Sequence, residues 1–300
     1  MKNIIYLSIL WSLIFVSCTK DENINDASGV FEAIEVIVSA EANGKINQFN
    51  IAEGDEIKKA QFLGVIDSTQ LHLSKLLLKA NKEAILSGKP DIKSQIEATQ
   101  KELDRLKHDQ KRVKKLFEGE VATQKQVDDI NAQINIVEAK LAAQKSSLNT
   151  NVNSIDQNGN VVDVKIAQIE DQIDKCIISS PIDGVVLVKY AEAGELTAMG
   201  KPLFKVANLT EIILRAYITA DQLDKISLGQ EVDVSAEYGK EGLKWYTGKV
   251  SWISSKSEFT PKTIQTQDER ANLVYAVKIR VKNDGFIKIG MYGGVNFIAK

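Results

Sequence analysis

Two stretches of the chain, GKINQFNIAEGDEIKKAQFLGVI at residues 44–66 and GVVLVKYAEAGELTAMGKPLFKV at residues 184–206, repeat one pattern without a gap. The matched residues are Gly44 with Gly184, Gly54 with Gly194, Asp55 with Glu195, Ala60 with Gly200, Leu63 with Leu203 and Ile66 with Val206. Glycine permits sharp turns where a Cβ would clash, and about 30 residues are too few to bury a core alone. We therefore predict that the two halves fold on each other, which brings residues 67 and 177 together.

Between the halves, from residue 68 to residue 176, the apolar residues follow a helical period. Two stretches alternate steps of three and four residues, which is the spacing of a coiled-coil seam. The first comprises Ile92, Ile96, Thr99, Leu103, Leu106, Gln110, Val113 and Phe117, and the second comprises Val127, Ile130, Ile134, Val137, Leu141, Gln144 and Leu148. Gly119 suits the left-handed residue that ends a helix, and Thr123–Gln126 has capping-box form. The pattern predicts an antiparallel helical hairpin with a short loop at its tip.

Two segments are predicted to interrupt this hairpin at similar heights. Ser87–Pro90 should break the ascending helix, because proline removes a backbone donor and clashes with the preceding turn. Asn149–Asn160, which contains Asn158-Gly159-Asn160, should break the descending helix. Both lie about 30 residues from the tip, so the upper arm should be roughly 40–45 Å long at about 1.5 Å per residue.

The N-terminus has the form of a bacterial export signal. Lys2 precedes an apolar run at residues 4–16 that is too short for a comfortable membrane span. Ser17-Cys18 and the polar residues that follow resemble a lipobox, although Phe15 stands where that motif prefers leucine. This predicts a signal peptide at residues 1–18, acylation of Cys18 and a polar tether at residues 19–29. An uncleaved anchor and an ordinary signal peptide remain alternatives.

Composition argues against several other classes of function. A net charge of −2 offers no global field for nucleic acid. His72, His108 and the two cysteines are too few for a His/Cys metal site, and a carboxylate site, which stays open, has no motif. With Cys18 acylated, Cys176 has no disulfide partner and should be a small core residue. No catalytic constellation is present, so we expect neither an enzyme nor a cofactor.

Three segments resemble HlyD-like periplasmic adaptors, also called membrane fusion proteins. Ser39–Ile46 with Glu53–Lys59, and Ser179–Val186, are similar to the two lipoyl half-motifs of that family, and Ile289–Val295 is similar to its closing barrel strand. The resemblance implies a mixed α and β fold: a lipoyl-like β-sandwich split by a long antiparallel coiled-coil hairpin and followed by a small β-barrel. The implied domains are the sandwich at 30–67 plus 177–207, the hairpin at 68–176 and the barrel at 208–300.

The same resemblance implies a function. Such a chain is a periplasmic adaptor of an export or efflux pump, which links an inner-membrane transporter, with an ABC permease favoured, to a TolC-like outer-membrane channel. It implies a homo-oligomeric ring, typically a hexamer, held to the membrane of a Gram-negative cell by the N-terminal lipid. A membrane-proximal domain is expected to be absent or rudimentary, because the chain stops at Lys300 soon after the last expected strand.

The hairpin tip resembles the channel-docking motif of the family. That motif has an arginine, a leucine four residues later and a serine seven residues after that; Arg112 and Leu116 match, and Thr123 stands for the serine. Leu116 lies off the predicted seam and is therefore free to face a partner. Each residue also has a plain alternative: Arg112 as a solvated charge, Leu116 as loop packing and Thr123 as a helix cap.

Two other functions fit the same architecture. A biotin or lipoyl carrier presents a lysine at a tight turn between the half-motifs, but here about 110 helical residues replace that turn, and Lys45 and Lys189 lack the flanking context. A non-efflux envelope or lipid-transport scaffold is not separated from an export adaptor by the sequence.

Overall fold

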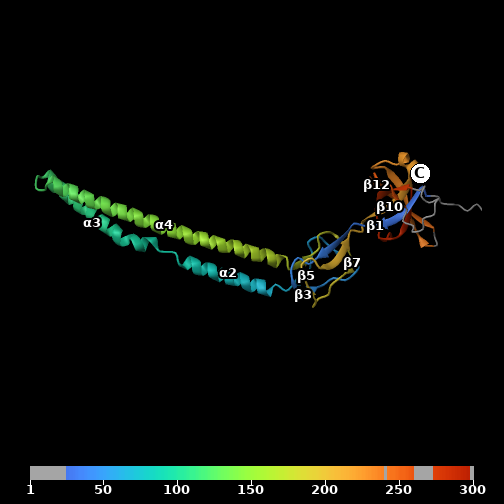
Figure 1. The fold of residues 1–300 in the computed structure, drawn as a ribbon, viewed down its shortest axis with the longest axis horizontal. Coiled ribbons are helices and arrows are strands. Elements are labelled where there is room, and N and C mark those ends of the chain that lie inside the picture. Colours follow the sequence, from blue (N-terminus) through green and yellow to red (C-terminus); the bar gives the residue numbers. More distant parts are fainter. Residues whose placement is uncertain (1–24, 240–241, 260–272, 298–300) are drawn as a thin grey trace, which may run out of the picture.

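The computed structural model describes residues 25–239, 242–259 and 273–297. The chain forms a long rod with a β-barrel at one end, a small β-sandwich next to it and a helical hairpin that projects from the sandwich (Figure 1). The expected mixed α and β fold class, with its hairpin and barrel, is confirmed.

The sandwich consists of two four-stranded sheets that the two sequence repeats build together. One sheet has the order β2 (Glu35–Ser39), β9 (Pro202–Ala207), β7 (Gly184–Lys189) and β4 (Glu56–Ile57). The other has the order β6 (Ile177–Ser179), β5 (Phe62–Ile66), β3 (Gly44–Phe49) and β8 (Leu196–Thr197). Each half gives its short strand to the other half, because β4 pairs with β7 and β8 pairs with β3.

The predicted equivalence of the two halves extends to their backbone hydrogen bonds. The Gly54 N–H donates to the Val186 carbonyl at 2.8 Å, and the Gly194 N–H donates to the Ile46 carbonyl at 2.7 Å. Both glycines have positive φ, +93° and +96°. These are turns that only glycine adopts easily.

Gly44 and Gly184, which the sequence repeat suggested as turns, instead begin strands β3 and β7. Their role is close approach. A Cβ on Gly184 would lie 2.4 Å from the carbonyl oxygen of Ala207, on the neighbouring strand. A side chain at this position would therefore push the two strands apart.

The hairpin contains α2 (Thr69–Ser87) and α3 (Ile92–Glu118), which pack in succession along the single helix α4 (Gln124–Asp174). The predicted break at Ser87–Pro90 is confirmed, and the Asp91 side chain caps α3. The break predicted at Asn149–Asn160 is wrong, because α4 runs through it unbroken.

Gly159 explains why α4 is continuous there. The residue is buried, and a Cβ on it would lie 3.2 Å from Leu86 Cδ2. The glycine therefore lets α4 pass close to the end of α2, and this tertiary contact outweighs the low helix propensity of the local sequence.

Ion pairs show that the break in the ascending arm leaves the register unchanged. Seven-residue steps along α2 meet seven-residue steps back along α4, and a further pair lies eighteen residues beyond on both strands of the hairpin. The pairs are Lys75–Glu170, Lys82–Asp163, Lys89–Asp156 and Lys107–Glu138. The non-helical residues 88–91 thus occupy the length along α4 that the register requires.

The predicted coiled-coil seam forms the core of the upper arm. Leu103, Leu106, Ile134 and Leu141 are buried in one cluster. Gln110 and Asn131 add a hydrogen bond of 2.6 Å between Nε2 and Oδ1. Phe117, assigned to the seam, is 40% exposed, so the tightly packed part ends before the tip.

The barrel has six strands that close on themselves, because β10 (Glu211–Thr219) pairs with both β1 (Ala27–Glu32) and β14 (Leu273–Lys282). The circuit is completed by β12 (Leu243–Ile253), β11 (Glu231–Glu237) and β15 (Tyr292–Asn296). The two-residue strand β13 (Glu258–Phe259) pairs with β14, and a short 3-10 helix, η1 (Ala220–Lys225), follows β10.

Strand β1 corrects the expected domain boundaries. Residues 27–29 were assigned to the tether and residues 30–32 to the sandwich, but β1 lies in the barrel between β10 and β15. Ala27, Gly29 and Phe31 alternate toward the interior and are buried, whereas Ser28 and Val30 face outward. The alternation of a half-buried strand is present in the sequence, but its partners lie far along the chain.

We predict that Gly29→Ala destabilises the protein by about 2 kcal/mol or more, as overpacking of a buried site does. A Cβ on Gly29 would lie 2.0 Å from the carbonyl oxygen of Arg215, a backbone atom that cannot rotate away. Thermal unfolding measures the loss. Ser28→Ala, at the exposed neighbouring position, is the control and should leave the stability within about 0.5 kcal/mol. Equal stability of both variants would contradict the pairing of β1 with β10.

Candidate docking site at the hairpin tip

The hairpin tip is a tight loop that folds back on the last turn of α3. The N–H groups of Val121 and Ala122 both donate to the Leu116 carbonyl, at 2.8 and 3.2 Å. Gly119, predicted to be left-handed, has φ −86°, and the left-handed residue is Glu120 with φ 59°. The prediction was displaced by one position because the turn closes after Gly119.

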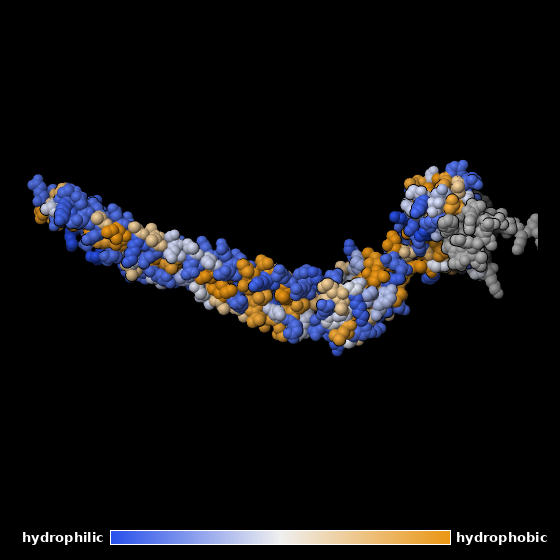
Figure 2. All heavy atoms as spheres, in the orientation of Figure 1, coloured by the Kyte–Doolittle hydropathy of each residue, from blue (hydrophilic) through white to orange (hydrophobic). Residues whose placement is uncertain are grey.

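This geometry leaves an apolar tip patch, which we define as Leu116, Phe117 and Val121. Their side chains are 43%, 40% and 74% exposed. Figure 2 shows that the surface around the tip is mostly hydrophilic, and Lys111, Arg112, Lys114 and Lys115 lie on the adjacent turns of α3. An apolar centre with a polar rim is the usual anatomy of a protein-binding surface.

The residues expected to dock lie in different roles around this patch. Arg112 is largely exposed and pairs with Asp109 on its own helix at 3.2 Å. Leu116 belongs to the patch. The Thr123 hydroxyl accepts the Gln126 N–H at 3.4 Å, and the Gln126 side chain accepts the Thr123 N–H at 2.8 Å. The predicted capping box is confirmed, so Thr123 has a role within the chain.

The sequence stage did not single out Phe117 and Val121. Phe117 fitted the spacing of the seam, and only the end of close packing exposes it. Val121 carried a signal, since it is a β-branched residue in a loop of Glu, Gly and Ala where turn residues are usual.

We predict that Thr123→Ala weakens the start of α4 by about 1 kcal/mol, the usual value of an N-cap side chain. Thr123→Ser keeps the hydroxyl and should lose little. Hydrogen exchange at the Gln126 and Val127 amides measures the difference. Unchanged exchange in Thr123→Ala would show that the hydroxyl does not cap the helix.

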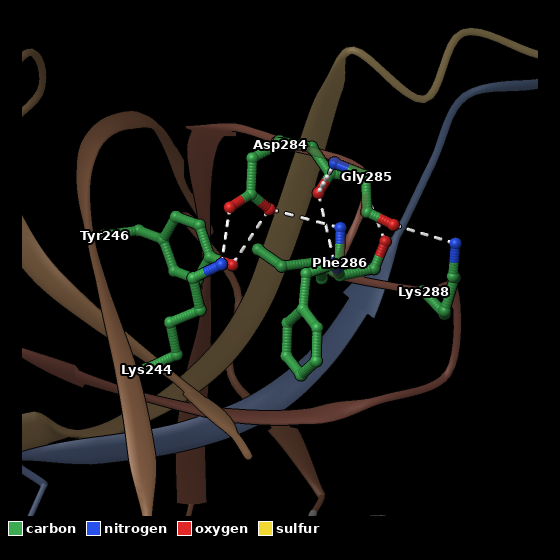
Figure 3. Close-up of polar contacts among 8 residues, drawn as sticks. Lys244, Tyr246, Asp284, Gly285, Phe286 and Lys288 are labelled. Atoms are coloured by element: carbon green, nitrogen blue, oxygen red, sulfur yellow. Dashed lines mark hydrogen bonds and ion pairs between the residues drawn. The ribbon is translucent and has the colours of Figure 1, made fainter.

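A second polar cluster lies at the joint between the barrel and the sandwich, on the loop 283–290. Figure 3 shows the Lys244 ammonium and the Tyr246 hydroxyl converging on the Asp284 carboxylate, which also accepts the Phe286 N–H. Lys244 lies over the rings of Tyr246 and Phe286, with 5.4 and 5.1 Å to the centroids. These contacts lower the pKa of Asp284 to about 2, first through the hydrogen bond from Lys244.

This cluster holds one wall of a groove between the two β domains. Asn283, Ile287 and Lys288 line the groove on the barrel side, and Lys58 and Asp183 line it on the sandwich side; its volume is about 1150 Å³. Because the Asn283 side chain also donates to the Leu209 carbonyl at 3.0 Å, the loop is tied to the connection between the domains. The cluster therefore fixes the angle of the joint.

The lowered pKa of Asp284 predicts a pH dependence. Its folded pKa, about 2, lies below the ordinary value of 3.8. The ionised carboxylate therefore contributes stability that is fully present above about pH 4 and is lost as the pH falls toward 2. We expect the wild-type melting temperature to fall more steeply over this interval than that of Asp284→Asn. Parallel curves for the two proteins would contradict the ion pair.

The other candidate reactive groups are occupied within the chain. The Lys189 ammonium pairs with Glu192 at 2.7 Å and lies 5.2 Å from the centroid of the Phe49 ring. Cys176 is a buried core residue, and burial raises the pKa of its thiol. Cys18 lies outside the described residues. Over the described ranges, no cluster of three or more metal-ligating side chains is present. None of the helices described there is long and apolar enough to span a membrane.

A comparison with protein families identifies the chain through its split sandwich and hairpin. The model of the CzcB-like barrel-sandwich hybrid domain matches residues 34–208, more than half of the chain, and this range contains both half-motifs and all three long helices. The chain belongs to this family. It is a membrane fusion protein, an adaptor of efflux-type systems and not an enzyme. The predicted membership of the HlyD-like adaptors is confirmed.

Relatives extend over nearly the whole chain. A UPF0194 membrane protein of Yersinia pseudotuberculosis is 25% identical over 302 residues, which cover 91% of this chain and 90% of that protein. A second, from Acidithiobacillus ferridurans, is 24% identical and covers 88% and 83%. The crystal structure of MacA from Actinobacillus actinomycetemcomitans matches with a TM-score of 0.54 and 21% identity, over 91% of this chain and 78% of MacA. This structural similarity supports the fold.

Proposed function

We propose that this chain is the periplasmic adaptor of an export pump, whose apolar tip patch docks an outer-membrane channel of the TolC type. The observation that carries the proposal is the position of the patch. It lies at the far end of a rigid hairpin, where α4 alone has 51 residues and therefore a length of about 75 Å. A surface needed only for folding would not be placed where the hairpin packing ends.

The barrel end is the natural place for the inner-membrane partner. Strand β1 enters the barrel at Ala27, at the opposite end of the rod from the tip (Figure 1). A lipid on Cys18 would be joined to Asn25 by a tether that spans at most about 25 Å. The anchor would therefore hold the barrel near the inner membrane, beside the transporter, for which we propose an ABC permease, while the hairpin points away from it.

We propose further that six copies form a ring around the transported substrate. One hairpin encloses no conduit, because α2 and α3 lie in succession along a single helix, α4. Several copies side by side would enclose one. The alternative, an envelope or lipid-transport scaffold with this architecture, differs in having no channel at the tip.

Crosslinking from the tip tests the docking. A cysteine that replaces Val121, treated with a thiol-reactive photocrosslinker in intact cells, should capture an outer-membrane channel that mass spectrometry identifies. The control is Ser147→Cys, exposed on α4 about midway along the rod. Capture from both positions alike, or no channel captured from the tip, would favour the scaffold function.

Substitution of the patch tests its energetic role. Leu116→Asp should weaken channel capture at least tenfold, because it places a charge where an apolar side chain must lose its water. Arg112→Ala removes only an exposed charge and should reduce capture much less. Circular dichroism should show an unchanged hairpin in both variants. Full capture with Leu116→Asp would mean that the patch does not touch the channel.

A further inference from the structure

Helix α2 has an apolar face that nothing in the chain covers. None of its side chains is buried, although its sequence is rich in leucine. Leu73, Leu76 and Leu77 are 54%, 64% and 71% exposed. Lys75 marks the side that faces α4, through its ion pair with Glu170. Leu73 and Leu77 lie two positions before and after Lys75, about 160° around the helix, and therefore point away from α4.

The uncovered side chains of α2 have the spacing of a second coiled-coil seam. They follow one another in steps of four, three, four and three residues: Leu73, Leu77, Ala80, Ala84 and Ser87, all exposed. Leucines at seam positions need a facing helix to pack against. We name this set the outer seam of α2.

Helix α4 carries a matching face on its own outer side. Val161 and Val164 are 56% and 60% exposed, and Asp163 between them points to α2 through its ion pair with Lys82. The outer positions again alternate steps of four and three and are all exposed and uncharged: Thr150, Ser154, Gln157, Val161, Val164 and Gln168. We name this set the outer seam of α4.

The two outer seams lie at overlapping heights on opposite edges of one hairpin. The ion pairs Lys75–Glu170 and Lys82–Asp163 place Leu77 level with Gln168 and Ala84 level with Val161. In Figure 2 apolar spheres gather over this lower part of the hairpin and thin out toward the tip. One edge is bulky and the other is small, so the two are complementary in shape.

We propose that the outer seam of α2 in one copy packs on the outer seam of α4 in the next copy. This assignment rests on the ring in the proposed function and names the surface that builds it. A second copy explains both faces at once, whereas a different protein would need only one of them. Two rods that point the same way bring α2 and α4 together antiparallel, the arrangement already present inside the hairpin. A contact between two different faces repeats from copy to copy and can close into a ring.

Disulfide trapping in membranes tests this contact with the full-length chain. One tagged chain carries Leu77→Cys and a second, differently tagged chain carries Val164→Cys. The co-expressed pair should form an oxidised heterodimer, while either variant alone should not form a homodimer. A chain with both substitutions should give a ladder of higher oligomers, because the two positions lie on opposite edges and cannot join within one chain.

A matched control sets the background. Lys79→Cys is exposed on another face of α2 at nearly the same height, and with Val164→Cys it should give at least tenfold less dimer. The wild-type chain accounts for Cys18 and Cys176. A heterodimer yield no higher than the Lys79 control would overturn the contact, as would strong homodimers of Leu77→Cys, which indicate a two-fold pairing. Channel capture from Val121 is measured separately, so failure of the seam contact leaves the docking proposal standing, and the converse also holds.

Discussion

The rest of the structure depends on the exchange of short strands between the two half-motifs. Because β4 pairs with β7 and β8 pairs with β3, neither half completes a sheet alone. The shared core, which includes Ile46, Leu63, Phe204 and Val206, exists only when both halves are present. This closure brings the ends of a long insertion together, where the Ile66 N–H donates to the Cys176 carbonyl at 2.8 Å. The base of the hairpin is thus fixed by backbone hydrogen bonds.

Above that base, the hairpin is rigid because its two sides differ. The ascending side is broken at Pro90, but the descending side is one continuous helix that supports both ascending pieces. Surface ion pairs contribute little energy singly. Their shared register on both sides of the break nevertheless means that the four pairs favour one alignment of α2 and α3 on α4. A shift of either piece would mismatch every pair along it.

The sequence predicted features whose causes are local and missed those whose causes are distant. The repeat, the seam, the break at Ser87–Pro90 and the cap at Thr123 depend on residues close together in the chain. The continuity of α4 at Gly159 depends on Leu86, and the place of β1 depends on Arg215 and Gly294, all far away in sequence. At the tip, Leu116 was predicted, whereas the exposure of Phe117 required knowing where close packing ends.

The insertion also explains why this fold does not act as a carrier. A carrier uses the turn between its half-motifs to present a lysine on a short, mobile arm. Here residues 68–176 occupy that turn, and the arm has become a rod with charged pairs along its length and apolar side chains at its end. Lys189, in the second half-motif, is held by Glu192 and covered by the Phe49 ring. The turn that delivers a reactive group in a carrier therefore delivers a binding surface in this chain.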